Sequence, residues 1–102
     1  MHHLIDEYLN FMAIEKGASP NTIDGYSRDL NRYAGFVGEL GIRKIGDIGT
    51  EELISYLARL QAEGLAANTV NRALAALRGF YKYLLREKKV DSAPIAHIEL
   101  AR

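Results

Sequence analysis

The 102-residue chain contains no cysteine, only two prolines and no net charge. Without cysteine it cannot form a disulfide framework, and zinc or iron–sulfur sites with cysteine ligands are excluded. No apolar run approaches the roughly 20 residues that a membrane-spanning helix requires, and no signal-peptide pattern opens the chain. We therefore expect one globular domain of the cytoplasm, with no membrane partner.

The chain also lacks an excess of charge of either sign, because 13 basic and 13 acidic side chains cancel. Their distribution is nevertheless uneven. Residues 1–15 carry three acidic side chains and no basic one, whereas residues 66–90 carry six basic side chains and one acidic one, a net charge of +5. A neutral total can therefore hide a basic face.

No segment alternates apolar and polar residues for long enough to predict a strand, which favours an all-α fold. Apolar residues recur instead at helical spacing in four segments, and we expect helices over about 3–15, 20–40, 51–63 and 67–88. Ser19 and Thr50 are the expected N-caps of the second and third helices. Gly17 and Gly64 are the expected stops after the first and third.

The apolar stripes of these helices predict the core. The stripe residues are Ile5, Tyr8, Leu9 and Met12; Ile23, Tyr26, Leu30, Tyr33 and Val37; Leu53, Leu57 and Leu60; and Val70, Ala73, Leu74, Leu77, Phe80, Tyr81, Leu84 and Leu85. The connection 41–49 has three glycines, and we expect Ile42, Ile45 and Ile48 to anchor it. Two helical hairpins that bury each other's stripes would form a four-helix bundle.

Two short segments of the chain are similar, "GASPNTI" at 17–23 and "GLAANTV" at 64–70, and we call each of them the phrase. Each phrase contains a glycine stop, a short loop and the start of the next helix. Two interpretations are open at this point. The hairpins are related as a repeat, or the phrase is the common way in which chains connect two helices. The predicted fold is the same in both cases.

The fourth predicted helix carries a basic arc opposite its apolar stripe. This arc holds four cations, no acid and two small residues at its centre: Asn71, Arg72, Ala75, Arg78, Gly79, Lys82, Tyr83 and Arg86. Glycine inside a helix costs roughly 1 kcal/mol relative to alanine, so Gly79 indicates a close approach by another group. Either a neighbouring helix packs there, or the arc lies against the phosphates of a nucleic acid.

Polar residues at two helix starts favour the nucleic-acid interpretation. Free backbone N–H groups at a helix N-terminus attract anions. Capping accounts for one polar side chain per start but not for the additional asparagine and threonine of each phrase. If the hairpins are related, both starts lie on one side of the bundle. On the second helix, Arg28 and Arg32 are the cations that we expect to add to this surface.

At this point the residues resemble the N-terminal core-binding domain of tyrosine recombinases, the phage-integrase and Xer-type enzymes. "SPNTIDGYSRDLNRYAGFV" (19–37) is similar to that domain's second helix through Ser19, Thr22, Tyr26, Asp29-Leu30 and Tyr33. "LAANTVNRALAALRGFYKYL" (65–84) is similar to its fourth helix through Arg72, Leu74, Ala76-Leu77-Arg78 and Phe80-Tyr81. "DSAPIAHI" resembles the exit toward a catalytic domain. The resemblance covers residues 4–98.

The resemblance implies a four-helix, SAM-like domain that forms half of a clamp around one recombination half-site. In that family the second and fourth helices cross the major groove. The residues expected to contact double-stranded DNA, from the resemblance and the basic arc together, are Ser19, Asn21, Thr22, Tyr26, Arg28, Asn68, Thr69, Asn71, Arg72, Arg78, Lys82 and Arg86. Residues 1–90 would form the domain, and residues 91–102 would lead to a catalytic domain absent from this chain.

Further partners are implied in the same way, namely the catalytic domain of the parent recombinase and neighbouring protomers in a tetramer on DNA. The location would be the prokaryotic cytoplasm, at the nucleoid during function. The catalytic arginines, the His-x-x-Arg element and the nucleophilic tyrosine of the family are not identifiable here. We therefore expect that this chain alone is not an enzyme.

Two other function classes were weighed. A protein–protein interaction module would use the Phe11 and Phe36 edges or the acidic first helix. A small helical enzyme is disfavoured, because the chain has no paired carboxylates with an accompanying base. No cofactor is expected without a phosphate-cradling glycine loop. His2 and His3 are interpreted as terminal surface residues rather than as a metal pair.

Overall fold

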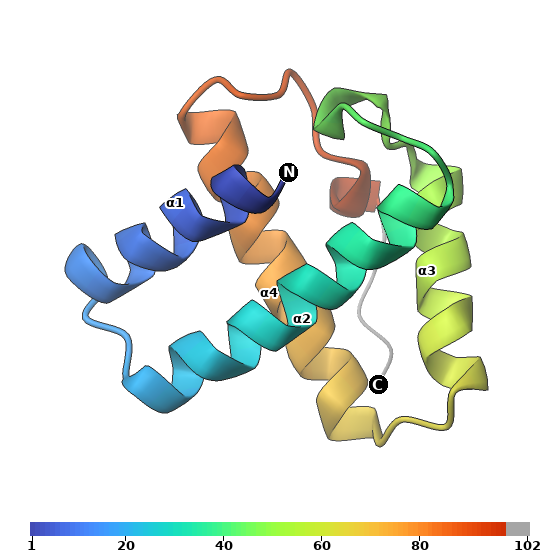
Figure 1. Cartoon of the computed structure of the whole chain (residues 1–102), viewed down its shortest axis with the longest axis horizontal. Coiled ribbons are helices and arrows are strands. Elements are labelled where there is room, and N and C mark those ends of the chain that lie inside the picture. Colours follow the sequence, from blue (N-terminus) through green and yellow to red (C-terminus); the bar gives the residue numbers. More distant parts are fainter. Residues whose placement is uncertain (98–102) are drawn as a thin grey trace.

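The computed structural model describes residues 1–97, and these form four α-helices and two short 3₁₀ helices without any strand. Figure 1 shows α2 crossing α4 near the centre, with α1 on one side of the crossing and α3 on the other. The all-α arrangement of four helices expected from the sequence is confirmed. The elements are α1 (His2–Ile14), α2 (Pro20–Glu39), η1 (Ile45–Asp47), α3 (Thr50–Ala62), α4 (Ala67–Arg86) and η2 (Pro94–His97).

The two similar phrases have the same backbone structure. Gly17 and Gly64 both adopt left-handed conformations, with φ of 63° and 74°, as the stops of α1 and α3. Ser19 and Ala66 then occupy equivalent extended N-cap positions, and each helix begins one residue later. The asparagine and threonine of each phrase thus stand at the second and third helical positions, which makes the two helix entries structurally equivalent.

The predicted N-cap of α3 is wrong by one residue. Gly49 is the N-cap, and Thr50 is the first residue of the helix. The Gly49 N–H donates to Oε1 of Glu52 over 2.6 Å. Glu52 therefore satisfies a backbone donor that precedes the helix, as the glutamate of a capping box does. The hydroxyl of Thr50 is not needed for this cap.

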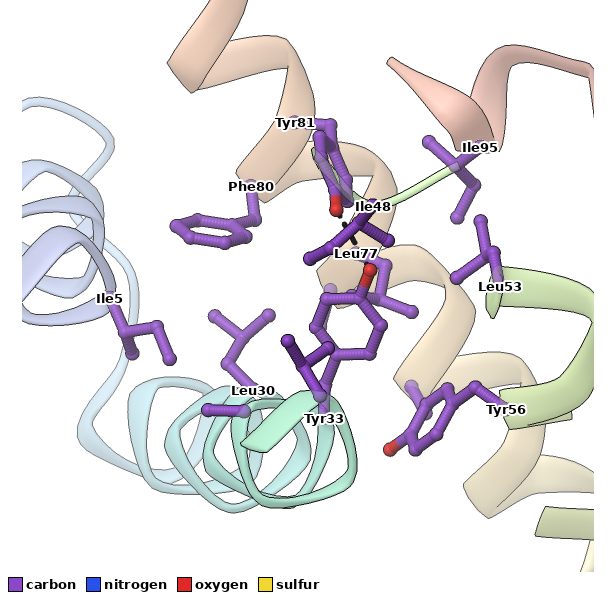
Figure 2. Packing of buried hydrophobic residues seen from close by; sticks show 14 of the residues in the cluster. Ile5, Leu30, Tyr33, Ile48, Leu53, Tyr56, Leu77, Phe80, Tyr81 and Ile95 are labelled. Atoms are coloured by element: carbon purple, nitrogen blue, oxygen red, sulfur yellow. Dashed lines mark hydrogen bonds between the residues drawn. The ribbon is translucent and has the colours of Figure 1, made fainter. Parts of the chain in front are cut away.

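The core lies where α2, α3 and α4 meet, and α1 closes it from the side of Ile5 (Figure 2). At its centre the hydroxyls of Tyr33 and Tyr81 share a hydrogen bond of 2.8 Å. Tyr56 extends from α3 to the Tyr33 ring, with 5.1 Å between ring centroids. Burial raises the pKa of the Tyr33 hydroxyl well above its usual range. These three tyrosine rings thus connect α2, α3 and α4.

The end of the packed unit differs from the prediction. Helix α4 ends at Arg86 rather than near Lys88, and Lys88 adopts a left-handed φ of 58°. Leu85 is expected in the apolar stripe, but it is 39% exposed, whereas its neighbour Leu84 is fully buried. Beyond it, Ile95 is buried against the core, so part of the expected exit segment packs on α3 and α4.

The connection between the hairpins behaves as expected. Ile45 and Ile48 are buried and Ile42 is half-buried against the core. Because these side chains anchor both ends of η1, the three glycines of the segment do not leave it detached. The connection therefore holds α3 in place beside α2.

Candidate nucleic-acid interface

A buried carboxylate joins α2 to α4. Asp29 on α2 is only 2% exposed, and Arg72 on α4 binds both of its oxygens. Arg72 Nε donates to Oδ2 over 2.8 Å, and Arg72 Nη2 donates to Oδ1 over 2.9 Å. A buried charge without a partner would strongly destabilise the fold, whereas a bidentate arginine satisfies it. This pair therefore fixes the crossing of α2 over α4, and its hydrogen bonds raise the pKa of the Arg72 guanidinium.

Gly25 supplies the space for this contact. A Cβ atom at Gly25 would lie 3.5 Å from Arg72 Nε and 3.6 Å from its Cδ and Cζ. The guanidinium thus lies directly on the α2 backbone, one helical turn before Asp29. The sequence predicts Arg72 as a phosphate contact but does not reveal Asp29 or Gly25 as its neighbours. The one feature of the sequence that could have indicated this pair is an acidic residue, Asp29, next to the stripe residue Leu30 of the second helix.

The centre of the basic arc is covered by protein. A Cβ atom at Gly79 would overlap the hydroxyl of Tyr8 on α1 and lie 3.3 Å from its Cζ. Gly79 therefore permits the close packing of α1 on α4, and the interpretation that it serves the approach of an anion is wrong. The burial that results raises the pKa of Tyr8 to about 12, with a smaller contribution from Tyr26.

The other cations of the arc lie in different environments. The Arg86 guanidinium lies over the Phe11 ring at 4.4 Å and contacts Glu87 at 3.2 Å. Arg78 is half-buried, while Lys82 is exposed. On α2, both Arg28 and Arg32 are exposed. The basic arc thus contains one exposed lysine, and the arginines on either side of it contact other protein groups.

The two polar helix starts differ in how they are capped. Ser19 Oγ accepts the Thr22 N–H over 3.2 Å and donates to Thr22 Oγ1 over 3.0 Å, which confirms Ser19 as the N-cap of α2. The N-cap of α4 is Ala66, which has no side-chain acceptor. Asn68 is exposed and Thr69 is half-buried at that start. The first N–H groups of α4 are therefore not capped by a side chain at Ala66.

Both starts lie toward the same edge of the molecule, the lower edge in Figure 1. Asn21 and Asn71, the remaining polar residues predicted near them, are exposed. Tyr26 is half-buried on α2, one turn beyond the α2 start. The structure thus arranges the predicted polar residues around the N-terminal halves of α2 and α4.

A groove of about 280 Å³ continues this surface between α1, α2 and α4. Its lining includes Tyr8, Tyr26 and Tyr83 together with three cations, Lys16, Lys82 and Arg86, and no acidic residue. This contribution is not visible in the sequence, because Lys16, which follows α1, joins the cations of α4 only through the packing of α1 on α4.

Two further kinds of site are absent from residues 1–97. No helix there is both long enough and apolar enough to cross a bilayer. Nor do three histidine, aspartate or glutamate side chains of this part of the chain come close enough together to hold a metal ion.

Comparison with known protein families identifies the family of this domain. Residues 5–88 match the family described as "Phage integrase, N-terminal SAM-like domain". The chain belongs to this family. The match confirms the resemblance to the tyrosine recombinases and favours it over a protein-interaction module.

Individual relatives of this phage-integrase domain carry recombinase names. "Tyrosine recombinase XerD" from Halalkalibacterium halodurans is 39% identical over 99 residues, which are 96% of this chain and 33% of the relative. "Tyrosine recombinase XerC" from Pelotomaculum thermopropionicum is 38% identical over 103 residues, covering 96% of this chain and 34% of the relative. "Tyrosine recombinase XerD" from Staphylococcus haemolyticus is 37% identical over 99 residues, 97% and 34% of the two chains.

The phage-integrase domain thus spans about a third of the length of the curated relatives it matches. Its similarity to them concerns the N-terminal domain of a tyrosine recombinase. The individual DNA contacts stay predictions, and so do the boundary at residue 90 and the larger assembly.

Proposed function

We propose that this chain is the DNA-binding domain of a site-specific tyrosine recombinase, clamping one recombination half-site through α2 and α4. The observation that carries the proposal is the fixed crossing of these helices. The Asp29–Arg72 pair holds α2 on α4 with two hydrogen bonds below 3 Å. The polar and basic residues of the two helices would therefore form one surface of fixed geometry.

The chemistry of this surface suits the phosphate backbone of a duplex. Exposed cations such as Arg28 and Lys82 would neutralise phosphates and release counterions. The uncapped N–H groups at the start of α4 would donate hydrogen bonds to a phosphate oxygen, because the helix dipole favours an anion there. Most contacts of this kind set position and orientation on the duplex, while a few base contacts supply sequence preference.

The catalytic step would belong to a separate domain that follows the SAM-like domain in the parent protein. In this arrangement the four-helix unit positions that catalytic domain for strand exchange and contacts neighbouring protomers of a tetramer on DNA. The relatives are recombinases of bacteria, so the proposed site of action is the nucleoid in the cytoplasm.

Salt dependence of duplex binding tests this function. With four to six phosphate contacts, the log of the binding constant should fall with the log of the salt concentration with a slope of about −4 to −5. Binding would be measured by fluorescence anisotropy of labelled duplexes. Binding that does not respond to salt, or no binding at low salt, would contradict the proposal.

Charge-neutralising variants locate the surface. Arg28→Gln and Lys82→Gln should each weaken binding to all duplexes and reduce the steepness of the slope by about 1. Arg43→Gln is the matched control, because Arg43 is an exposed cation in the connection between the hairpins. An equal effect of all three substitutions would show that binding depends on overall charge rather than on α2 and α4.

A further inference from the structure

Building on the DNA-binding function above, we propose that Asp29 is a positioning residue that aims Arg72 at the DNA. Asp29 holds one edge of the Arg72 guanidinium, so that the free edge of the same group faces outward. Arg72 then recognises a pair of acceptor atoms on the duplex with a fixed orientation. Arg28 and Lys82, by contrast, would act as mobile point charges.

The donors of Arg72 can be counted. A guanidinium has five N–H donors in a planar fork. Nε and Nη2 each use one N–H on the two oxygens of Asp29. Three N–H donors remain, and two of them, one on Nη1 and one on Nη2, form the end-on pair. That pair is the geometry in which arginine binds two acceptors at once.

Burial explains why the orientation is fixed. Asp29 is almost completely buried on α2, so its carboxylate moves little. The Arg72 side chain is 40% exposed, which leaves part of it accessible. Gly25 lets the guanidinium lie on the α2 backbone, with Arg72 Nε 3.5 Å from the position of a Cβ there. Arg72 is thus held by α2 and still open to solvent.

The advantage is a smaller loss of side-chain freedom on binding. An unrestrained arginine loses rotamer entropy when it is fixed on a ligand, whereas a preoriented one has already lost it on folding. The position of Arg72 also suits DNA contact. It lies little more than one turn from the start of α4 and beside the N-terminal half of α2, among the polar residues proposed to face the duplex.

The acceptor pair on DNA has two possible sources with the same chemistry. Two oxygens of one phosphate accept an end-on guanidinium, and so do O6 and N7 of guanine in the major groove. The shared ligand class is therefore a bidentate acceptor on duplex DNA. Duplexes modified at either a guanine or a phosphate distinguish the two sources, because only one modification should weaken the binding that depends on Arg72.

The test measures binding of the 102-residue chain to a duplex enriched by the wild type from a randomised library. Asp29→Asn and Arg72→Ala should each weaken binding by about 5- to 150-fold, the range for one bidentate contact. Asp29→Asn should have no further effect, within about twofold, once Arg72 is alanine, because Asp29 acts through Arg72.

Three controls separate positioning from stability. Leu60→Val thins the core on α3 and keeps both Asp29 and Arg72, so it should bind DNA like the wild type well below its melting temperature. Arg72→Lys keeps the charge but loses the fork, so it should weaken binding more than Arg28→Lys does. This comparison remains valid even if Asp29→Asn fails to fold.

Modified duplexes identify the acceptor. Replacing one guanine by 7-deazaguanine removes N7, and replacing one phosphate by a methylphosphonate removes its charge. One such probe should weaken the wild type and leave Arg72→Ala unaffected. A guanine partner would make the loss depend on sequence, whereas a phosphate partner would make it uniform and reduce the salt slope by about 1.

The outcomes are distinct. If wild type binds DNA but Asp29→Asn binds equally well, the positioning role is overturned while the DNA-binding function stands. An equal loss from Asp29→Asn in the Arg72→Ala background would also overturn it, because Asp29 would then act only on stability. If the folded wild type binds no duplex at low salt, the DNA-binding function fails, and the positioning role fails with it.

Discussion

At the scale of single residues, three buried tyrosines have different hydrogen bonding in one core. Tyr33 and Tyr81 bond to each other over 2.8 Å, whereas the buried Tyr56 hydroxyl has no hydrogen-bond partner within residues 1–97. A buried polar group without a partner lowers stability, while removing one member of a bonded pair leaves the other unsatisfied. The same substitution should therefore cost more stability at Tyr33 than at Tyr56.

Tyr33→Phe should lower the free energy of unfolding by about 1–3 kcal/mol, because it leaves the Tyr81 hydroxyl buried and unpaired. Tyr56→Phe removes a hydroxyl without a partner, and it should change the free energy by less than about 0.5 kcal/mol or raise it slightly. Urea denaturation followed by circular dichroism compares the two. A similar loss in both variants would show that the Tyr56 hydroxyl has a bonding partner, such as a bound water molecule.

At the scale of helices, the two equivalent starts offer a comparison within one chain. Ser19 caps α2 by accepting the Thr22 N–H, whereas Ala66 holds the same backbone position before α4 without a side-chain acceptor. The backbone at Ala66, with φ of −61° and ψ of 149°, is close to that of Ser19, at −69° and 155°. A serine at position 66 is therefore expected to bond to the Thr69 N–H.

Ser19→Ala should destabilise the fold by about 1 kcal/mol, and Ala66→Ser should stabilise it by about 0.5–1 kcal/mol. The double variant should have nearly the wild-type stability. Each cap bonds within its own helix start, so the loss at position 19 and the gain at position 66 should add. Thermal and urea melts of the three variants provide the measurement. No gain from Ala66→Ser would indicate that the start of α4 is already satisfied in another way.

The contact between α1 and α4 gives a second prediction at this scale. Gly79→Ala adds a methyl group that overlaps the Tyr8 hydroxyl, so we expect a net loss of about 1–3 kcal/mol in spite of the better helix propensity of alanine. Gly35→Ala is the control, because no atom lies within 4 Å of its added Cβ, and it should gain about 0.5–1 kcal/mol.

Urea denaturation of both alanine variants measures these effects. Tyr8→Phe should reduce the cost of Gly79→Ala, because it removes the overlapping hydroxyl. Equal stabilisation by both glycine substitutions would contradict the close packing of α1 on α4 that the structure shows at Gly79.

At the scale of the whole molecule, each of the four helices contributes a buried tyrosine, and the stability of the fold depends on these hydroxyls remaining protonated. Burial raises the pKa of Tyr8 and of Tyr81 to about 12 and raises those of Tyr33 and Tyr56 further. In the unfolded chain a tyrosine titrates near pH 10. Above that pH the unfolded state loses protons that the folded state keeps, so stability is complete below pH 10 and falls as the pH rises toward the folded values.

We expect the free energy of unfolding to be flat from about pH 7 to 9 with respect to these groups. It should then fall above pH 10 by up to about 1.4 kcal/mol per pH unit for each buried tyrosine. Urea midpoints between pH 8 and 11 measure this fall. Tyr8→Phe removes one titrating group and should make it less steep. Constant stability from pH 9 to 11 would contradict the burial of these hydroxyls.

Local signals in the sequence determined the helices and their order, apart from small shifts at their ends. A glycine stop, a serine N-cap and a proline in the first turn act over a few residues, so they are readable without knowledge of the fold. The apolar stripes identified most of the core for the same reason. Residues 98–102, the last part of the expected exit, lie outside the described structure.

Only the tertiary structure decided which residues meet across helices. Periodicity shows that residues share a face of one helix, but not which other helix covers that face. Asp29 therefore became a buried partner of Arg72, and Gly79 became the contact of Tyr8, only when the chain was folded. The sequence by itself determined the two helices of the candidate interface. Their crossing, and the orientation of Arg72 on it, came from packing between segments 43 residues apart.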